Sequence, residues 1–334
     1  MASPEGTSRR VDPLVLVERM LAGDRLALAR LITQVENRTD AVPAIMRAIH
    51  VRDDGAFVVG ITGPPGAGKS TVVDRLTALL RADGATVGVV AVDPSSPFTG
   101  GAVLGDRIRM QAHTLDPGVF IRSMATRGSL GGLSRATGEV VKLLAAFGFQ
   151  WILIETVGVG QTELDVMKLA DTTVVVLVPE SGDAVQTMKA GLMEAADVFV
   201  VNKADRAGAH GLMAELTFTA HLHHASATSA KDVDWEIPVL GAEAQNNVGI
   251  AELLGEIRRH RAVLEASGVL GARRKARRRA EFQRLLVDRF KAKLERDLAS
   301  GDLGATLDRV ADGSMDPYSA ADAILARADF SGRE

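Results

Sequence analysis

Cysteine is absent from this 334-residue chain, and aromatic residues are scarce, at 4% of the total. Without cysteine there is no disulfide framework, no thiolate metal site and no cysteine nucleophile. The longest purely apolar runs, such as Val174–Pro179, are far shorter than the roughly 18 residues that a membrane-spanning helix needs. The first ten residues also lack the apolar centre of a signal peptide. We therefore expect a cytoplasmic protein.

Neither acidic nor basic residues are in clear excess, because the formal net charge is only −3. This balance gives no reason to expect nucleic acid or a membrane surface as a partner. Apolar residues make up 46% of the chain, a normal value for a globular protein with a sizeable core. The length suggests one large domain with appendages, or two domains.

Short β-branched runs alternate with amphipathic segments from Phe57 onward. Continuous apolar runs of this length are typical of strands that are buried on both faces of a parallel sheet. The intervening segments, such as Ser70–Arg81 and Leu133–Ala146, are long enough to be crossover helices. The pattern predicts an α/β fold, a doubly wound and mostly parallel sheet over residues 55–266. The expected strands are Phe57–Thr62, Val87–Val92, Trp151–Glu155, Val174–Val178 and Val198–Asn202.

Both ends of the chain have a different composition. Residues 1–54 contain apolar residues at helical spacing, and Gly23-Asp24 is typical of a helix stop followed by a new N-cap, so we expect a small helical extension. Residues 267–334 begin with a basic run and continue into one apolar stripe of a long helix. Within this part we expect Gly301–Gly313 to be rich in loop and Ser319–Arg327 to form a short last helix.

The first chemistry-bearing motif fits the pattern G-x-x-x-x-G-K-[ST], follows an apolar run and precedes a helix. Its glycines let successive backbone N–H groups surround phosphates, and the helix N-terminus adds positive potential. Lys69 is expected at the β- and γ-phosphates and the Ser70 hydroxyl on Mg²⁺. The expected nucleotide-binding residues of this loop are Gly63, Pro64, Pro65, Gly66, Ala67, Gly68, Lys69, Ser70 and Thr71.

The second motif is Asn202-Lys203-Ala204-Asp205, directly after an expected strand. The Asp205 carboxylate can accept hydrogen bonds from the ring N–H and the exocyclic amine of guanine. Adenine has neither donor there, so a buried acceptor would be left unpaired and ATP would be rejected. Asn202 is expected at the other edge of the base, and the stem of Lys203 over its face. The two motifs together predict a GTP-binding protein.

The third motif is Glu155-Thr156-Val157-Gly158, at the end of another expected strand. Glu155 is placed to hold Mg²⁺ directly or through water, and the Gly158 N–H to contact the γ-phosphate. Many regulatory GTPases have Gln after this glycine to orient the attacking water. Here the residue is Val159, which cannot orient water, so we expect slow intrinsic hydrolysis that a partner accelerates.

A fourth group, Asp93-Pro94-Ser95-Ser96, also follows an expected strand, and Asp106 lies further along. Ligands bind at the carboxyl ends of strands in open α/β sheets, so Asp93 and Asp106 are candidate Mg²⁺-side carboxylates. Arg107 or Arg109 would meet phosphate charge. The expected catalytic residues are therefore Lys69, Asp93, Glu155 and Gly158, and the metal group is Ser70, Asp93, Asp106 and Glu155.

Two weaker features have ordinary explanations. His221, His223 and His224 form a small cluster, which a solvent-exposed helix face explains better than a metal site. The basic run Arg273–Arg279 is more often a solvated helix face than a ligand site. The apolar stripe that follows this run favours a dimer contact over an internal core.

These segments together resemble the methylmalonyl-CoA mutase-associated GTPases, the MeaB or ArgK group of P-loop GTPases. The similarity extends from about Leu14 to the end and is strongest between Gly60 and Asp205. The most specific pieces are Asp93-Pro-Ser-Ser with Thr99-Gly-Gly and Leu104-Gly-Asp106, Glu155-Thr-Val-Gly-Val-Gly-Gln161, and Ser129-Leu-Gly-Gly-Leu133.

The resemblance implies a GTPase chaperone that binds an adenosylcobalamin-dependent acyl-CoA mutase, gates cofactor loading and protects the mutase. It implies GTP or GDP and Mg²⁺ as ligands, and a homodimer formed through the C-terminal helical arm. It also implies that Pro179–Gly191, which contains Asp183 and Lys189, is a switch that couples nucleotide state to the mutase.

One departure from the family concerns the base-binding loop, which usually carries Ser or Thr before Gly or Ala. Here Leu240 stands at that position, so we expect backbone contacts from Gly241 and Ala242 instead. Two other functions stay open. One is a kinase linked to basic amino-acid transport, although no phosphoryl-acceptor site is evident. The other is a metal-delivery GTPase, although such proteins use Cys- or His-rich segments.

Overall fold

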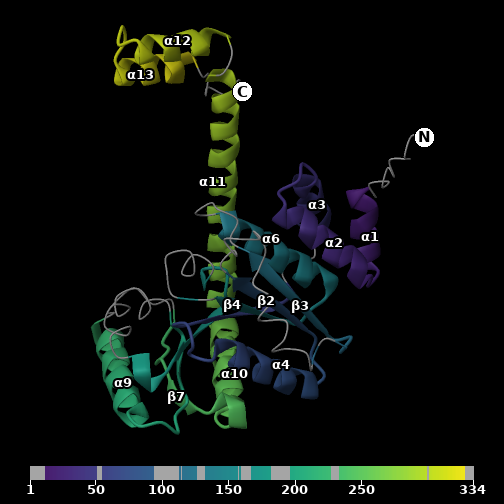
Figure 1. Ribbon diagram of the computed structural model, residues 1–334, viewed down its shortest axis with the longest axis vertical. Helices are drawn as coiled ribbons and strands as arrows, with labels where there is room; N and C mark the ends of the chain where they lie inside the picture. The colour runs from purple at the N-terminus through teal and green to yellow at the C-terminus, as the bar shows by residue number, and fades with distance from the viewer. Residues whose placement is uncertain are drawn as a thin grey trace, which may run out of the picture. The chain divides into compact units, whose positions relative to one another are not determined.

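The computed structural model describes residues 12–50, 55–93, 113, 115–125, 132–156, 158, 167–181, 196–226, 233–298 and 301–327. The chain divides into two compact units, residues 1–270 and 271–334. Figure 1 shows the elements of both units along the chain.

The first unit contains a seven-stranded sheet with strand order β3-β2-β4-β1-β5-β6-β7. Every pair of neighbouring strands is parallel, which confirms the expected doubly wound α/β fold. All carboxyl ends of the strands therefore lie at one edge of the sheet. The strands are β1 (Phe57–Thr62), β2 (Val87–Asp93), β3 (Val119–Ala125), β4 (Trp151–Thr156), β5 (Thr172–Leu177), β6 (Val198–Asn202) and β7 (Val239–Ala242).

Helices cover both faces of this sheet, as strands that are apolar on both sides require. On one face, α4 (Lys69–Ala82) and α10 (Ile250–Ala266) pack on Val59 and Ile61 of β1 and on their neighbours. The other face carries α6 (Gly132–Phe147) and α9 (Ala209–Ser226). All side chains of the central strand β1 are buried, which explains its unbroken apolar sequence.

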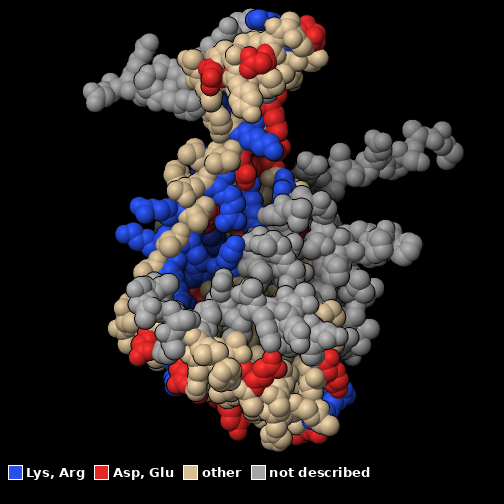
Figure 2. Space-filling model, turned by 90° about the vertical axis from the view of Figure 1, so that its left-hand side faces the viewer, with Lys and Arg blue, Asp and Glu red and all other residues tan. Residues whose placement is uncertain are grey.

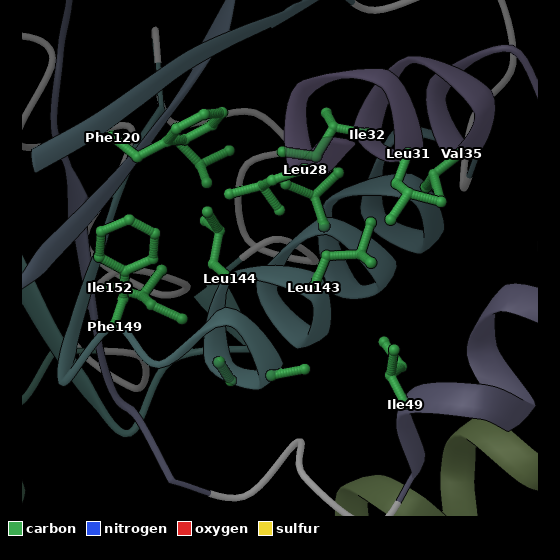
Figure 3. Close-up of a cluster of buried hydrophobic side chains, with 14 of the residues drawn as sticks. Leu28, Leu31, Ile32, Val35, Ile49, Phe120, Leu143, Leu144, Phe149 and Ile152 are labelled. Atoms are coloured by element: carbon green, nitrogen blue, oxygen red, sulfur yellow. The ribbon is translucent and has the colours of Figure 1, made fainter. Parts of the chain in front are cut away.

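The N-terminal helices α1 (Pro13–Leu21), α2 (Arg25–Glu36) and α3 (Val42–Ile49) pack against α6. Figure 3 shows Leu28 and Ile32 of α2 beside Leu143 of α6 within one apolar cluster. The extension therefore belongs to the core of the first unit. Asp24 is the predicted N-cap, because its carboxylate accepts hydrogen bonds from the N–H groups of Leu26 and Ala27.

Two strands, β3 and β7, were not predicted from the sequence. β3 lies at one edge of the sheet, and polar residues such as Arg122 and Ser123 interrupt its apolar pattern. Arg122 forms an ion pair with Glu36 of α2, which fastens the N-terminal helices to this edge. β7, at the opposite edge, is only four residues long and contains Gly241.

The second unit is helical. Its main element is α11 (Val269–Leu298), the long helix that the sequence predicted, and α13 (Pro317–Arg327) confirms the short last helix. The expectation that Gly301–Gly313 is rich in loop was wrong, because Gly301–Ala311 forms helix α12. Apolar residues at helical spacing, Leu303, Leu307 and Val310, outweigh the two glycines of this segment.

Helix α11 carries eleven basic and four acidic residues. Six of the basic residues fall within Arg273–Arg279, and Figure 2 shows Lys and Arg side chains gathered on one face of the molecule. No described helix of either unit is long and apolar enough to cross a membrane.

Candidate functional site

The predicted phosphate loop connects the end of β1 to the start of α4, at the carboxyl edge of the sheet. Two of its glycines are required by their surroundings. Gly63 has φ +145°, and a Cβ there would lie 1.9 Å from the Val176 carbonyl oxygen. Gly68 has φ +87°, and a Cβ there would lie 2.3 Å from Nδ2 of Asn202. Only glycine fits such positions, and the loop can therefore pass close to β5 and β6.

Lys69 is the first residue of α4, and its side chain is buried. The ammonium donates hydrogen bonds of 2.9 Å to the carbonyl oxygens of Gly63 and Pro64, so it lies within the turn of the loop. The loop is closed by a further bond, from Ala67 N–H to the Pro64 carbonyl, at 3.2 Å. A buried cation beside a helix N-terminus is an arrangement that binds anions.

Ser70 follows Lys69, and its hydroxyl donates a 2.5 Å hydrogen bond to Oε1 of Glu155 at the end of β4. Both side chains are buried. The next residue of β4, Thr156, bonds to Thr62 at the end of β1, at 2.9 Å. Thr62 in turn donates to the carbonyl of Gly158, also at 2.9 Å. The structure therefore brings the predicted residues Ser70, Glu155 and Gly158 to the end of the phosphate-loop strand.

The pairing of Ser70 with Glu155 fits a magnesium ion, because Mg²⁺ prefers hard oxygen ligands and keeps several waters. In the described part of the chain, no group of three or more acidic or histidine side chains is placed to hold a metal ion. Asp93 ends β2 at the same edge, but its side chain and the whole of Asp106 lie outside the described residues. Ser70 and Glu155 are thus the two described residues that would hold the ion.

Asn202 is the last residue of β6 and Lys203 follows it, as the sequence predicted. Nδ2 of the buried Asn202 donates to the Ala67 carbonyl at 2.8 Å, and its Oδ1 accepts from the N–H of Ala244 at 3.0 Å. Lys203 has φ +57°, and its ammonium donates to the Gly66 carbonyl at 3.0 Å. Both residues therefore fasten the predicted base site to the phosphate loop. Asp205, two residues further, is exposed.

The predicted base contacts Gly241 and Ala242, together with Leu240, lie inside β7. The Ala242 carbonyl accepts from the Ala204 N–H at 3.0 Å. Asn202 contacts the backbone of the short turn η4 (Ala244–Asn246), which begins two residues beyond these predicted base contacts. The turn-forming Asn246-Asn247 pair and Gly249, just before an amphipathic helix, were the sequence signal for this turn.

Arg206 and Glu180 form an ion pair at the rim of the site. Glu180 belongs to the turn η3 (Pro179–Ser181) after β5, and Arg206 follows the base-binding motif. The hydrogen bond from the Arg206 guanidinium holds the pKa of Glu180 below its ordinary value. This pair connects the base-binding segment to the start of the predicted switch, whose residues Asp183 and Lys189 lie outside the described part.

Of the three clustered histidines, the structure describes the side chain of His221 only. His221 lies on α9, is largely exposed and contacts Glu236 at 2.7 Å. The side chains of His223 and His224 lie outside the described residues, as do Arg107, Arg109 and Val159.

Comparison with known proteins shows which family this chain matches. The family described as "Methylmalonyl Co-A mutase-associated GTPase MeaB" matches residues 28–298. A Pyrococcus abyssi protein that is named as a GTPase is 51% identical over 93% of this chain and 95% of its own length. The mouse mitochondrial protein named methylmalonic aciduria type A homolog is 33% identical, over 96% of this chain and 81% of its own.

A solved structure described as an "LAO/AO transport system kinase" has a TM-score of 0.67 to this chain and 27% sequence identity. The match covers 95% of this chain and 98% of the other, so the likeness includes more than the sheet.

Proposed function

Because this chain belongs to the MeaB family of methylmalonyl-CoA mutase-associated GTPases, we propose that it is a Mg²⁺-dependent GTPase chaperone. Its client is an adenosylcobalamin-dependent acyl-CoA mutase. The chaperone gates the loading of the cofactor into this mutase and protects the mutase from inactivation. The observation that carries the GTPase part is the meeting of three motifs at one sheet edge: Lys69 and Ser70, Glu155, and Asn202.

In this proposal the phosphate loop binds the triphosphate through its backbone N–H groups and Lys69. Magnesium, when bound, offsets the negative charge that is shared by the β- and γ-phosphates. Ser70 and Glu155 hold this ion, joined by Asp93 and Asp106. Gly158, whose carbonyl is fixed by Thr62, presents its N–H toward the γ-phosphate.

Guanine selectivity comes from Asp205, as its carboxylate accepts from the ring N–H and the amine of guanine. The backbone of the turn η4 takes the place that was predicted for Gly241 and Ala242. With Val159 after Gly158, intrinsic hydrolysis is slow and the client accelerates it.

Coupling to the client uses the segment after Glu180, including Asp183 and Lys189. The ion pair of Glu180 with Arg206 supports this part, since it joins that segment to the base-binding loop. Dimerisation uses α11, on which Phe282, Leu286 and Phe290 are exposed to 64%, 57% and 39%. Exposed apolar side chains at this spacing are typical of a helix that pairs with another helix.

A capture experiment tests the client. Tagged protein, loaded with a non-hydrolysable GTP analogue or with GDP, is incubated with native lysate, and the bound proteins are identified. Recovery of an acyl-CoA mutase that depends on the nucleotide supports the proposal, whereas recovery of transport proteins alone contradicts it.

A labelled-nucleotide assay tests the reaction itself. Release of phosphate to water, faster in the presence of the mutase, supports a chaperone GTPase. Transfer of the γ-phosphoryl group to arginine or to a protein acceptor would instead support the kinase alternative.

A further inference from the structure

The turn η4 is held from two sides by residues that are distant in sequence. On one side, the Ala244 N–H donates to Oδ1 of Asn202 at 3.0 Å. On the other side, Nε of Arg75 donates to the Ala244 carbonyl at 3.2 Å and Nη2 donates to the Gln245 carbonyl at 3.3 Å. Ala244 itself is buried, so its peptide groups need these partners, together with the Asn247 N–H, which donates to the Ala244 carbonyl at 3.3 Å.

Arg75 belongs to α4, the helix that begins with Lys69 and Ser70. Asn202 reaches the phosphate loop through the Ala67 carbonyl at 2.8 Å. A closed series of hydrogen bonds therefore runs from the phosphate loop through Asn202 to Ala244, and from Ala244 through Arg75 back to the helix that starts at Lys69. This series sets the distance between the phosphate-binding and base-binding backbone.

We propose that Arg75 is a positioning residue for purine recognition, which holds the turn η4 so that the backbone N–H of Gln245 meets a purine carbonyl at position 6. This inference rests on the proposed GTPase function. A trans peptide is planar, so an arginine that fixes a carbonyl also fixes the opposing N–H of the same peptide. The N–H of Gln245 therefore points away from α4, and a purine with an amine at position 6 offers it no acceptor.

The guanidinium suits this role because it is planar and carries several N–H donors in a fixed arrangement. Nε and Nη2 reach two successive carbonyl oxygens at once. A lysine keeps the charge but places a single ammonium there, and so it cannot orient both peptides equally well.

The test compares GDP, IDP and ADP binding by calorimetry in the wild type, Arg75→Ala and Arg75→Lys. GDP and IDP both have an oxygen at position 6, while ADP has an amine. We expect Arg75→Ala to weaken GDP and IDP binding by the same factor, roughly tenfold, or about 1.4 kcal/mol. ADP binding, which depends on the phosphate loop, stays unchanged, and Arg75→Lys gives an intermediate loss.

Kinetics and stability separate positioning from a general structural role. For GTP, Arg75→Ala should raise KM while kcat changes by less than about twofold. Arg258→Ala is the matched control. Like Arg75, Arg258 is an arginine that joins α4 to a neighbouring element, because it forms a 2.5 Å ion pair from α10 to Asp83 at the end of α4. This control should leave the ratio of GDP to ADP affinity unchanged.

An equal loss for all three nucleotides in both Arg75 variants, with a lower Tm, would overturn the inference in favour of a structural role. Unchanged affinities would overturn it as well. If the wild type binds ADP as tightly as GDP, the proposed GTPase function fails, and the role of Arg75 fails with it.

Discussion

Ser70 and Glu155 lie 85 positions apart in the chain, yet the Ser70 hydroxyl donates a 2.5 Å hydrogen bond to Glu155 Oε1. Ser70 is the second residue of the helix after β1 and Glu155 is the second-last residue of β4, and these two strands are direct neighbours in the sheet. A hydroxyl and a carboxylate in this arrangement are oxygen ligands for a small divalent cation.

Ser70→Ala and Glu155→Gln should therefore remove the effect of Mg²⁺ on GTP affinity. With Mg²⁺ present, we expect affinity to fall by roughly ten- to a hundredfold, while affinity in EDTA changes little. Calorimetry with and without Mg²⁺ measures both. Ser267→Ala is the control, because this exposed hydroxyl bonds only to the backbone of Val263, Leu264 and Val269. The same loss in EDTA would contradict a metal role.

Lys69→Ala should weaken GTP binding by about a hundredfold, or roughly 3 kcal/mol, because a buried ammonium at the phosphates is lost. Fluorescence titration with a labelled nucleotide measures the change. Lys291→Ala, on the surface of α11, is a charge-matched control that should not alter affinity. Full affinity in the Lys69 variant would place the phosphates elsewhere.

Asp205→Asn should change base preference from guanine to xanthine. The asparagine amide donates to the 2-oxo group of xanthine, whereas it cannot accept from both guanine donors. We expect GTP affinity to fall by at least roughly tenfold and xanthosine triphosphate to become the better ligand. Competition binding with both nucleotides measures the ratio. A variant that still prefers GTP would argue against Asp205 as the base contact.

Gly68→Ala should lower stability and nucleotide affinity together. The added Cβ meets Nδ2 of Asn202 and the backbone has φ +87°, so the expected loss of unfolding free energy is about 1–3 kcal/mol. Gly255→Ala in α10 is the matched control, because its added Cβ meets nothing within 4 Å beyond the adjoining helix backbone. That substitution should raise stability by about 0.5–1 kcal/mol. Urea unfolding gives both values, and equal effects would contradict the predicted close approach.

Asp116 should contribute to stability at neutral pH and lose that contribution in acid. The Arg81 guanidinium, and then the Gly118 N–H, hold the pKa of this carboxyl below its ordinary value of 3.8. A group with a lowered pKa in the folded state stabilises that state above the unfolded value and ceases to do so as pH falls through the folded one.

The difference in unfolding free energy between wild type and Asp116→Asn should therefore be constant from pH 7 to 5. Below about pH 4 it should shrink. Urea unfolding at successive pH values tests this, and a difference that grows in acid would contradict the expected sign.

Sequence and structure agree most closely where local physics decides. The phosphate loop, the central strands and the Asp24 cap depend on glycine conformation, apolar runs and side-chain capping, which neighbouring residues specify. The edge strands β3 and β7 were missed, because a strand with one neighbour tolerates polar residues and short length. Helix α12 was missed for a different reason. Its glycines indicated a loop, but its apolar residues at helical spacing outweigh them.

By itself, the sequence determined the order of the motifs, the doubly wound fold and the residue types at the nucleotide site. Tertiary structure alone decided which distant groups meet. Asn202 bonds to both Ala67 and Ala244, and Arg75 bonds to the turn η4. These contacts join segments up to 170 residues apart, and no local pattern encodes such a distance. Parallel strand pairing creates them, because it brings the carboxyl ends of separate strands to one edge.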